Sequence, residues 1–565
     1  MDRVTKSFLE DFRKSNELPN GIEEKILFEH FANYSIVEPR TEFSFDIEKI
    51  NIGSDGTIGL DGFALIINKQ LIFSEDELND YLNFHKKSYA EVIFIQAKTS
   101  PKFDSKEIGG FGYAVNDFVS EEQKLRWSDS AIEKIKLFNS FVKKIPELSE
   151  KPICSLFYIS LGRDEKDQNV YARVSEIKNN ISEENIFSIV NMDLIDATDI
   201  QNRYKQIGQA ITKTFEYEKR VTLPVIKDVD ESYIGVVSAK TILKLMTNEE
   251  GILIPNVFYD NVRDFQGNNK VNSEIEYTLK SSYKDSFSIL NNGITVVAES
   301  LIATRDNFTI SNYQIINGCQ TSHVLLNNKD FIDDSVQVSL KLVISKNEEF
   351  ISRIIRSTNR QTEVKDQDLI AFSTFQKRLE DYYKTFSGDD RLFYERRSKQ
   401  YNSQLTEKKR IIDKTTQIKA VTSMFFDKPD MATRYFGALF EEFGDRLFKD
   451  NHELIPYYVS SFGLYKIESL FRNAKIDAKY KKIKYHMLAM LRHEISNEKL
   501  PVFESKKIVP LCDSINSVLK NESQLLLHIN AITHKIDMIG TPINDNEVSK
   551  SKEFVKRCLD VYKHR

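Results

Sequence analysis

Two apolar segments set the architecture of the first part of the chain: Leu60-Asp61-Gly62-Phe63-Ala64-Leu65-Ile66-Ile67 and Val92-Ile93-Phe94-Ile95-Gln96-Ala97-Lys98. Short runs rich in β-branched and aromatic residues predict buried strands. Asp61 opens the first strand, and Gln96 and Lys98 are two residues apart, so their side chains point to the same face of the sheet. Converging strands would bring together a carboxylate, an amide oxygen and an ammonium, a set that suits phosphodiester hydrolysis at a divalent metal.

These residues resemble the PD-(D/E)xK nuclease superfamily, the restriction-endonuclease-like fold, in the D…QxK form of Mrr-like enzymes. The resemblance implies a metal-dependent endonuclease that uses Mg²⁺ or Mn²⁺, with Asp61, Gln96 and Lys98 as catalytic residues. Gln96 stands where Glu is usual, so metal binding would depend more on Asp61 and on another carboxylate. The alternative is an edge strand with a solvated Lys98 and an Asp61 that belongs to a turn.

The resemblance also implies that a further catalytic carboxylate comes from the preceding helix, expected over residues 22–34. Glu29 is the residue chosen on this helix, and Glu24 and Glu23 are alternatives. The expected metal ligands are therefore Asp61, Gln96 and Glu29.

Composition limits the class of protein. The chain has 565 residues, of which 29% are charged and 41% hydrophobic, which is typical of a globular protein with several domains. Because the formal net charge is -5, a nucleic-acid partner must be bound by local basic patches. The four cysteines lack metal-ligand spacing and are expected to be reduced. We expect a cytoplasmic protein without membrane contact, since no apolar run reaches membrane-spanning length and residues 1–20 do not resemble a signal peptide.

Three regions are expected along the chain, which together make a multidomain protein of α/β and α+β class. Residues 1–215 alternate strands and helices, which predicts a mixed sheet flanked by helices, as in the restriction-endonuclease-like fold. Expected elements of this region include a strand over 43–52, a helix over 75–84 and a strand over 153–161. Residues 216–410 are expected to form an α+β core, and residues 411–565 a largely helical part.

Two asparagine–glycine turns occur in the central region. Asn291-Asn292-Gly293 precedes an expected strand, and Asn317-Gly318 follows one, with Gln320 in the first turn of a helix. A tight turn before a helix N-terminus leaves backbone N–H groups unpaired, which favours an anion site. Further contacts with phosphate are expected from Arg353, Arg356, Arg396 and Arg397. The alternatives are asparagines that satisfy the turn backbone, and arginines on solvated faces or in ion pairs.

Five motifs in order resemble the abortive-infection phage-resistance family, AIPR, over roughly residues 220–500. They are Asn261-Val262-Arg263, Asn291-Asn292-Gly293, Asn317-Gly318-Cys319-Gln320, Ser357-Thr358-Asn359-Arg360-Gln361-Thr362 and Phe393-Tyr394-Glu395-Arg396-Arg397. The resemblance implies bacterial defence against phage, often with a nuclease-like domain at the N-terminus. Because an unrestrained nuclease would destroy its host, we expect the AIPR domain to gate this activity. We expect DNA as the substrate, although nothing in the sequence excludes RNA. Cleavage of both strands of a duplex would favour a homodimer.

A different class of function remains open. The protein could be a sensor or toxin whose nuclease-like fold binds nucleic acid or a nucleotide without cutting it, and which acts with partner proteins of a defence system. The neutral Gln96 favours this alternative.

A basic segment lies near the C-terminal end of the region that resembles AIPR. Its basic residues are Lys479, Lys481, Lys482, Lys484, His486 and Arg492. Tyr480, Tyr485 and Met487 lie between them in the sequence. This pattern suits a helix that binds nucleic-acid backbone. The alternative is a helix with one packed face and one solvated, charged face.

Overall fold

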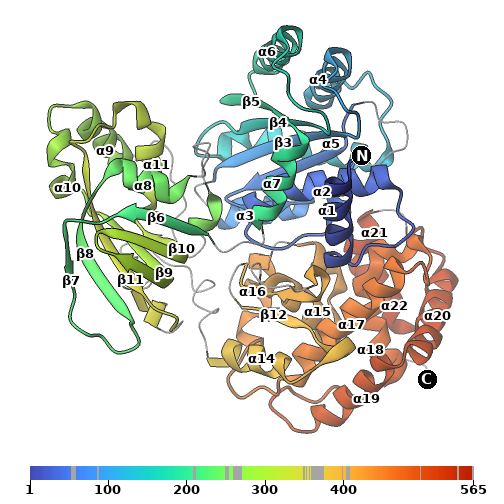
Figure 1. Ribbon diagram of the computed structural model, residues 1–565. Helices are drawn as coiled ribbons and strands as arrows, with labels where there is room; N and C mark the ends of the chain where they lie inside the picture. Colours follow the sequence, from blue (N-terminus) through green and yellow to red (C-terminus); the bar gives the residue numbers. More distant parts are fainter. Residues whose placement is uncertain are drawn as a thin grey trace.

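The computed structural model describes residues 1–52, 59–85, 88–207, 211–247, 254–258, 270–347, 350–351, 353–354, 357, 374–396, 399–401, 407–434, 436–496, 498–543 and 546–562. They form a multidomain structure that mixes α and β elements (Figure 1). We divide it into an N-terminal part (1–207), a central part (211–347) and a helical part (374–562). Each part has an apolar core of its own.

The N-terminal part contains a five-stranded mixed sheet with the order β2-β1-β3-β4-β5. Its strands are β1 (Gly62–Ile67), β2 (Gln70–Ile72), β3 (Ala90–Lys98), β4 (Ile153–Ser160) and β5 (Ile189–Ile195). β1 pairs antiparallel with β2 and β3, whereas β3, β4 and β5 run parallel to one another. Parallel neighbours need long connections, which helices provide here.

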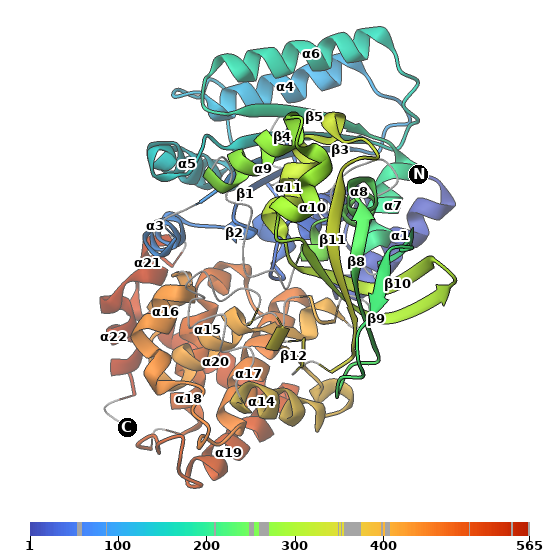
Figure 2. The ribbon, with the colours of Figure 1, turned by 90° about the vertical axis from the view of Figure 1, so that its left-hand side faces the viewer.

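Helices cover both faces of this sheet. On one face lie α1 (Arg3–Ser15), α2 (Glu24–Val37) and α7 (Ala197–Ile207), which share a core with Ala64, Ile93 and Ile95. The other face packs on α3 (Glu75–Phe84), α4 (Ser105–Val119), α5 (Asp129–Lys144) and α6 (Gln168–Glu183). Figure 2 shows α4 and α6 side by side on this second face. The expected mixed sheet with helices on both faces is therefore present.

The strand expected over residues 43–52 was a wrong prediction. The segment contains the 3₁₀ helix η2 (Ile47–Lys49), which Asp46 caps, and a single β-bridge joins Asn51 to Gly62. The chain turns here because Ile47 and Ile50 enter one core of the N-terminal part, whereas Ile52 enters the other. An apolar run does not reveal by itself that its members belong to different cores.

The central part contains a six-stranded sheet with the order β6-β10-β9-β11-β8-β7. The strands are β6 (Thr212–Glu216), β7 (Arg220–Thr222), β8 (Glu231–Ser238), β9 (Ile294–Thr304), β10 (Asn307–Asn317) and β11 (Gln337–Ile344). One face packs on the helices α8 (Ala239–Met246), α9 (Lys270–Lys280), α10 (Phe287–Leu290) and α11 (Cys319–Asn327). Figure 1 shows these helices gathered on one side of the sheet.

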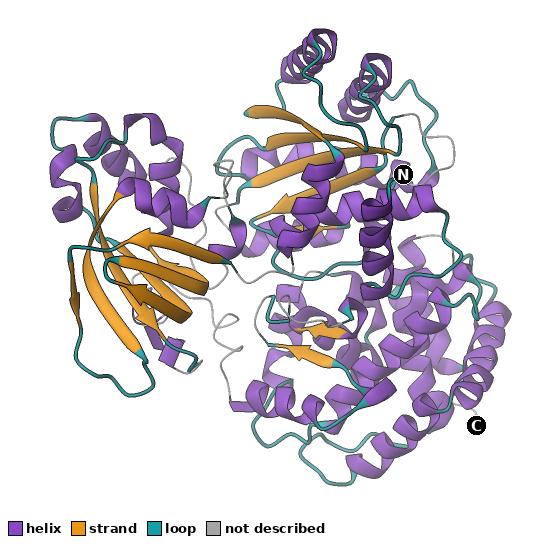
Figure 3. Ribbon diagram, viewed as in Figure 1, coloured by secondary structure: helices purple, strands orange, loops and turns teal. Residues whose placement is uncertain are grey.

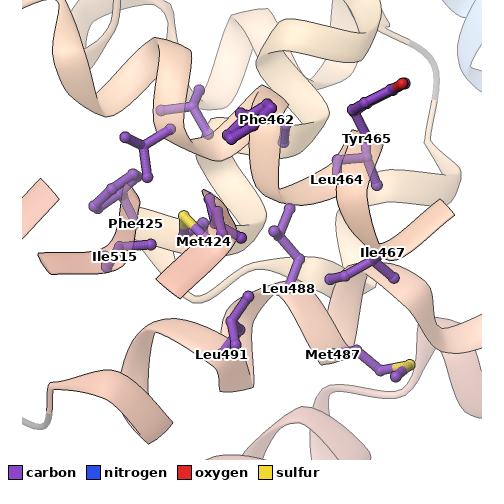
Figure 4. Close-up of a cluster of buried hydrophobic side chains, with 14 of the residues drawn as sticks. Met424, Phe425, Phe462, Leu464, Tyr465, Ile467, Met487, Leu488, Leu491 and Ile515 are labelled. Atoms are coloured by element: carbon purple, nitrogen blue, oxygen red, sulfur yellow. The ribbon is translucent and has the colours of Figure 1, made fainter. Parts of the chain in front are cut away.

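The helical part is built around a core shared by long helices. Met424, Phe462, Leu488 and Leu491 interlock in this core (Figure 4). The helices are α14 (Thr374–Lys384), α15 (Lys414–Phe426), α16 (Phe436–Phe443), α17 (Ile455–Arg472), α18 (Lys484–Ile495), α19 (Ile508–Lys520), α20 (Glu522–Ile539), α21 (Asn546–Lys550) and α22 (Lys552–Asp560). A short parallel pair, β12 (Phe393–Glu395) and β13 (Ile411–Asp413), lies among them (Figure 3). In the described structure, no helix has the length and apolar character needed to cross a bilayer.

The parts divide at positions that differ from the expected boundaries after residues 215 and 410. β6 pairs with β10, so the central sheet already begins at Thr212. The core of the helical part begins with Phe375 and Leu379 of α14. Both differences arise from contacts between distant segments, which local composition does not show.

The helical part docks on the N-terminal part through ion pairs. Arg434 binds Asp80 through two nitrogens, at 2.6 and 2.5 Å. Lys399 and Glu38 form a pair in which both side chains are almost fully buried. The other pairs are Arg410–Glu17, Arg472–Glu17, Lys409–Asp46, Lys481–Glu48, Lys550–Asp76 and Lys482–Glu133. Among the ion pairs that join described residues of these two parts, every cation belongs to the helical part and every carboxylate to the N-terminal part.

Candidate active site

Asp61 and Gln96 are brought together by the pairing of β1 with β3. Asp61 directly precedes β1, and its backbone N–H donates to the carbonyl oxygen of Ile95 at 2.9 Å. The Asp61 carboxylate accepts hydrogen bonds from the Gln96 amide at 2.5 Å and from the Ala97 N–H at 2.8 Å. Gln96 is 1% exposed, and its Oε1 atom has no hydrogen-bond partner among the described residues.

Two further charged groups surround Asp61. Lys98 ends β3 on the same face as Gln96 and is half-buried. Glu29 lies on α2 with its side chain buried, and Lys25 faces it at 3.7 Å. Burial and then the negative charge of Asp61 raise the pKa of Glu29 to about 7, while Lys25 and Lys98 oppose this rise. Burial also raises the pKa of Asp61, although the Ala97 N–H and Lys98 favour its charged form.

The alternative carboxylates on α2 lie in a different environment from Glu29. Glu23 and Glu24 are exposed, and Glu24 pairs with Lys6 at 3.1 Å. Glu29, in contrast, is buried, and the charge of Asp61 raises its pKa. The choice of Glu29 as the carboxylate that accompanies Asp61 stays a prediction.

Asn33 connects α2 to the start of β1. It is fully buried and lies one helical turn after Glu29. Its amide nitrogen donates to Asn51 Oδ1 at 2.6 Å and to the Asp61 carbonyl oxygen at 3.2 Å. Gly62 makes room for this amide, since a Cβ atom at position 62 would lie 2.3 Å from Asn33 Oδ1.

Tyr158 and Glu107 lie on the other side of Gln96. Tyr158 is opposite Gln96 in the register of β3 and β4, and its hydroxyl donates to Glu107 Oε2 at 3.1 Å. Burial and then Glu107 raise the pKa of Tyr158 far above its usual value, and Asp61 adds to the rise. The sequence reasoning missed Asn33, Tyr158 and Glu107 because strand register and helix placement, rather than a local motif, bring them to the site.

The side chains at this site fit a divalent metal with oxygen ligands. Asp61 and Glu29 provide carboxylates, and rotation of the Gln96 amide would turn its unpartnered oxygen toward Asp61. In the described ranges, no group of three or more His, Cys, Asp or Glu side chains could hold a metal. A metal at this site would therefore need the amide oxygen and water in addition to the two carboxylates, a ligand set that Mg²⁺ accepts.

The central part brings the two asparagine–glycine turns into contact. Gly293, with φ of 74°, precedes β9, and Gly318, with φ of 93°, follows β10 and caps α11. A Cβ atom at Gly318 would lie 2.9 Å from the carbonyl oxygen of Gly293, so a larger residue does not fit. The two turns therefore lie next to each other, and the anion site expected at them stays a prediction.

Three of the side chains at these turns form hydrogen bonds within the protein. Asn317 accepts a hydrogen bond from the Gly318 N–H at 2.7 Å, and Asn291 donates to the Phe287 carbonyl oxygen at 3.0 Å. Gln320 accepts from Asn272 at 2.9 Å, whereas Asn292 is exposed. These bonds agree with the alternative in which the asparagines satisfy the turn backbone.

About half of the chain matches a known protein family. Residues 258–537 match the family model described as AIPR protein. This AIPR region covers just under half of the chain and confirms the resemblance that the motifs predict. Searches among curated proteins and among solved structures gave no match. The AIPR region starts in the central part and ends in α20, so it does not include the sheet that carries Asp61.

Arg396, one of the arginines expected at an anion site of the AIPR region, lies away from the turns. Arg396 is 1% exposed and pairs with Glu380 at 3.1 Å. It follows β12, which Figures 1 and 2 place in the helical part, apart from α11. Arg396 is therefore corrected from a phosphate contact to a buried ion pair, because α14 supplies a carboxylate beside it.

The structure describes only one of the other three arginines expected at this anion site. Arg353 is exposed. Two of the expected arginines, the whole of one motif and all but Ser357 of another lie outside the described residues: Arg356, Arg397, Asn261-Val262-Arg263 and Thr358-Asn359-Arg360-Gln361-Thr362.

Three of the six basic residues named between 479 and 492 pair within the helical part. Lys484 pairs with Glu468, Arg492 with Asp427 and Lys479 with Asp537. His486 is buried. The alternative of one packed and one charged face therefore describes most of this segment. Lys481 and Lys482 differ, because they reach the N-terminal part.

Proposed function

We propose that the protein is a metal-dependent endonuclease of bacterial anti-phage defence, with DNA as its main substrate. The observation that carries this proposal is the buried contact between Asp61 and Gln96, with Lys98 on the same face of β3. The AIPR match supports a role in abortive infection, in which the AIPR region gates the N-terminal part. Mg²⁺ or Mn²⁺, when bound, supplies Lewis acidity toward the phosphate oxygens.

The residues of the N-terminal part have distinct roles in this proposal. Asp61, Gln96 and Glu29 would hold the metal, and the Ala97 N–H fixes the Asp61 carboxylate in advance. Lys98 stabilises negative charge on the phosphate or orients the attacking water. Burial and Asp61 raise the pKa of Glu29 to about 7 in the metal-free protein, so this carboxyl group is partly ionised at neutral pH before a metal binds.

Cleavage of plasmid DNA and of RNA in the presence of Mg²⁺, Mn²⁺ or EDTA tests the proposal. We expect cleavage with a divalent metal and none with EDTA. Asp61→Asn and Lys98→Ala should each lower the rate by roughly 10²–10³-fold or more, the loss typical of one preorganised electrostatic group. The control Lys102→Ala removes a nearby exposed lysine and should leave the rate unchanged. Wild-type cutting by folded Asp61→Asn protein would rule out this site.

A second candidate function is a sensor that binds nucleic acid or a nucleotide without cutting it. The neutral amide of Gln96 favours this function, because it leaves the site with fewer charged ligands than a third carboxylate would give. Binding that does not depend on metal, together with intact substrate under Mg²⁺ and Mn²⁺ alike, would select the sensor. The effect on phage would then depend on partner proteins.

A further inference from the structure

A short 3₁₀ helix of the helical part, η12 (Ala478–Ile483), lies against the N-terminal part. Lys481 pairs with Glu48 of η2, and Lys482 pairs with Glu133 of α5 at 2.9 Å. Both lysines thus extend from the AIPR region toward the domain that carries the candidate active site.

A chain of contacts leads from these two lysines to Asp61. Glu48 and Asn51 lie in the same short segment, and Asn51 accepts a hydrogen bond from Asn33 at 2.6 Å. The same Asn33 amide donates to the Asp61 carbonyl oxygen at 3.2 Å. On the other side, Lys134, which follows Glu133, donates to the Asn51 carbonyl oxygen. These contacts connect the segments that bind Lys481 and Lys482 to the backbone of Asp61.

Replacing the carboxylate partner of either lysine by another anion should cost little free energy, because both ion pairs are exposed to water. The side chains of Lys481 and Glu48 are 38% and 54% exposed, and those of Lys482 and Glu133 are 40% and 46% exposed. Exposed ion pairs of this kind contribute little to stability, because water screens them. A phosphate group offers a lysine the same kind of charged acceptor.

We propose that Lys481 and Lys482 form part of the nucleic-acid-binding surface of the candidate active site, where each exchanges its carboxylate for a phosphodiester group. The inference rests on the proposed function for the identity of the site. The surface is then composite, since the AIPR region supplies the cations and the N-terminal part supplies the Asp61 site. Phosphate contacts of this kind position the strand and carry no sequence information.

Neighbouring lysines provide a matched contrast. Lys475 pairs with Glu522 and Lys479 with Asp537, both within the helical part, and each lysine side chain is 40% exposed. They resemble Lys481 and Lys482 in type and exposure but do not contact the N-terminal part in the described structure. Loss of Lys475 and Lys479 changes the net charge by the same amount.

The experiment measures the affinity of the full chain for a short labelled duplex in EDTA, at several salt concentrations. We expect Lys481→Gln with Lys482→Gln to weaken binding roughly tenfold or more. The slope of log affinity against log salt should become shallower by about 2, since two phosphate contacts are lost. Lys475→Gln with Lys479→Gln should change neither quantity appreciably. Equal effects of the two pairs, or none from the first, would overturn the inference.

A third variant separates phosphate binding from a role in docking. Glu48→Gln with Glu133→Gln breaks the same two ion pairs but leaves the lysines in place. If the lysines bind phosphate, this variant should bind nucleic acid as tightly as wild type or more tightly. If the ion pairs only hold the parts together, it should bind as weakly as the lysine variant, and the inference fails.

Failure of the proposed binding surface can be distinguished from failure of the proposed nuclease function. Loss of binding in the lysine variant, with no cleavage by wild type under any metal, would support the surface and reject the nuclease. Cleavage by wild type that the lysine variant matches in rate and affinity would support the nuclease and reject the surface. A wild-type protein that does not bind the duplex would overturn the inference directly.

Discussion

Gln96 limits how strongly the candidate site attracts a cation. Its nitrogen donates to Asp61, and the pKa of Glu29 near 7 means that this second carboxyl group is only partly ionised at neutral pH. The site is therefore less negative than one with three ionised carboxylates. We expect weak binding of Mg²⁺ and better activity with Mn²⁺, which accepts softer ligands more readily.

Gln96→Glu should keep activity or shift the preferred metal. We expect it to destabilise the metal-free protein by about 1–3 kcal/mol, because a further carboxyl group would be buried beside Asp61. Added metal should then raise the melting temperature of the variant more than that of wild type. Thermal unfolding with and without metal measures this difference, and Gln70→Glu on β2 is the control. A metal response equal to that of wild type would argue against Gln96 as a ligand.

Glu395 gives the protein a pH-dependent stability. It is 4% exposed and lies opposite Asp413 in the pairing of β12 with β13. Burial and then Asp413 raise the pKa of Glu395 from 4.5 to about 8. The folded protein keeps a proton that the unfolded chain loses above its lower pKa. The contribution of Glu395 to stability is therefore full below that pKa and is lost as the pH rises to about 8.

Glu395→Gln should remove this dependence, because the amide does not titrate. We expect the melting temperature of the variant to fall less than that of wild type between about pH 5 and pH 8. Glu407→Gln, which changes an exposed carboxylate in the same part, should follow wild type. Parallel curves for wild type and Glu395→Gln would show that Glu395 does not hold the proton.

Elements with strong local signals were predictable from the sequence. The helix expected over 75–84 is α3, and Ser74 caps it by accepting the Glu77 N–H at 3.2 Å. The strand expected over 153–161 is β4. The structure also brings Asp61 and Gln96 into contact, because β1 pairs with β3.

Elements and contacts that depend on distant partners were not predictable in the same way. The burial of Arg396 depends on Glu380 of α14, and the position of Tyr158 beside Gln96 depends on the register of two strands far apart in the sequence. Residues 43–52 carry apolar side chains like a strand, but two separate cores divide them. Local periodicity contains none of this information.

Gly62 tests the link between α2 and β1. In Gly62→Ala the new Cβ would lie 2.3 Å from the buried Asn33 amide, so either α2 or the start of β1 must shift. We expect a loss of about 1–3 kcal/mol in the free energy of unfolding, typical of overpacking. Gly110→Ala is the control, because a Cβ there meets nothing within 4 Å and alanine favours the helix. Equal stabilities of the two variants would show that Asn33 adjusts freely.

At the scale of the whole molecule, the ion pairs between the N-terminal and helical parts all have the same polarity among the described residues. The carboxylates of the N-terminal part face cations of the helical part at sites from Glu17 to Glu133. Most of these pairs are partly exposed, whereas Lys399 and Glu38 are buried. The buried pair should therefore dominate the electrostatic part of docking, since water screens the others.

Glu38→Gln should destabilise the docked molecule by about 3–5 kcal/mol, because it leaves Lys399 buried without its carboxylate. Asp76→Asn breaks the more exposed pair with Lys550 and should cost no more than about 1 kcal/mol. Hydrogen exchange of the backbone near Glu38 and in β12 measures both changes. Similar protection in the two variants would contradict a dominant role for the buried pair.

The one-sided charge of this interface has a consequence during synthesis on the ribosome. Lys399 follows Glu38 by 361 residues in the sequence, and Arg472 follows Glu17 by 455 residues. The ribosome must therefore synthesise these residues before either ion pair can form. At about 5–20 residues per second, the docking face of the nascent N-terminal part stays uncovered for roughly 20 to 90 s. A face that is rich in carboxylates remains hydrated during this interval, whereas an apolar face would invite aggregation. The sign of the charges thus suits a domain that must stay soluble before its partner has been translated.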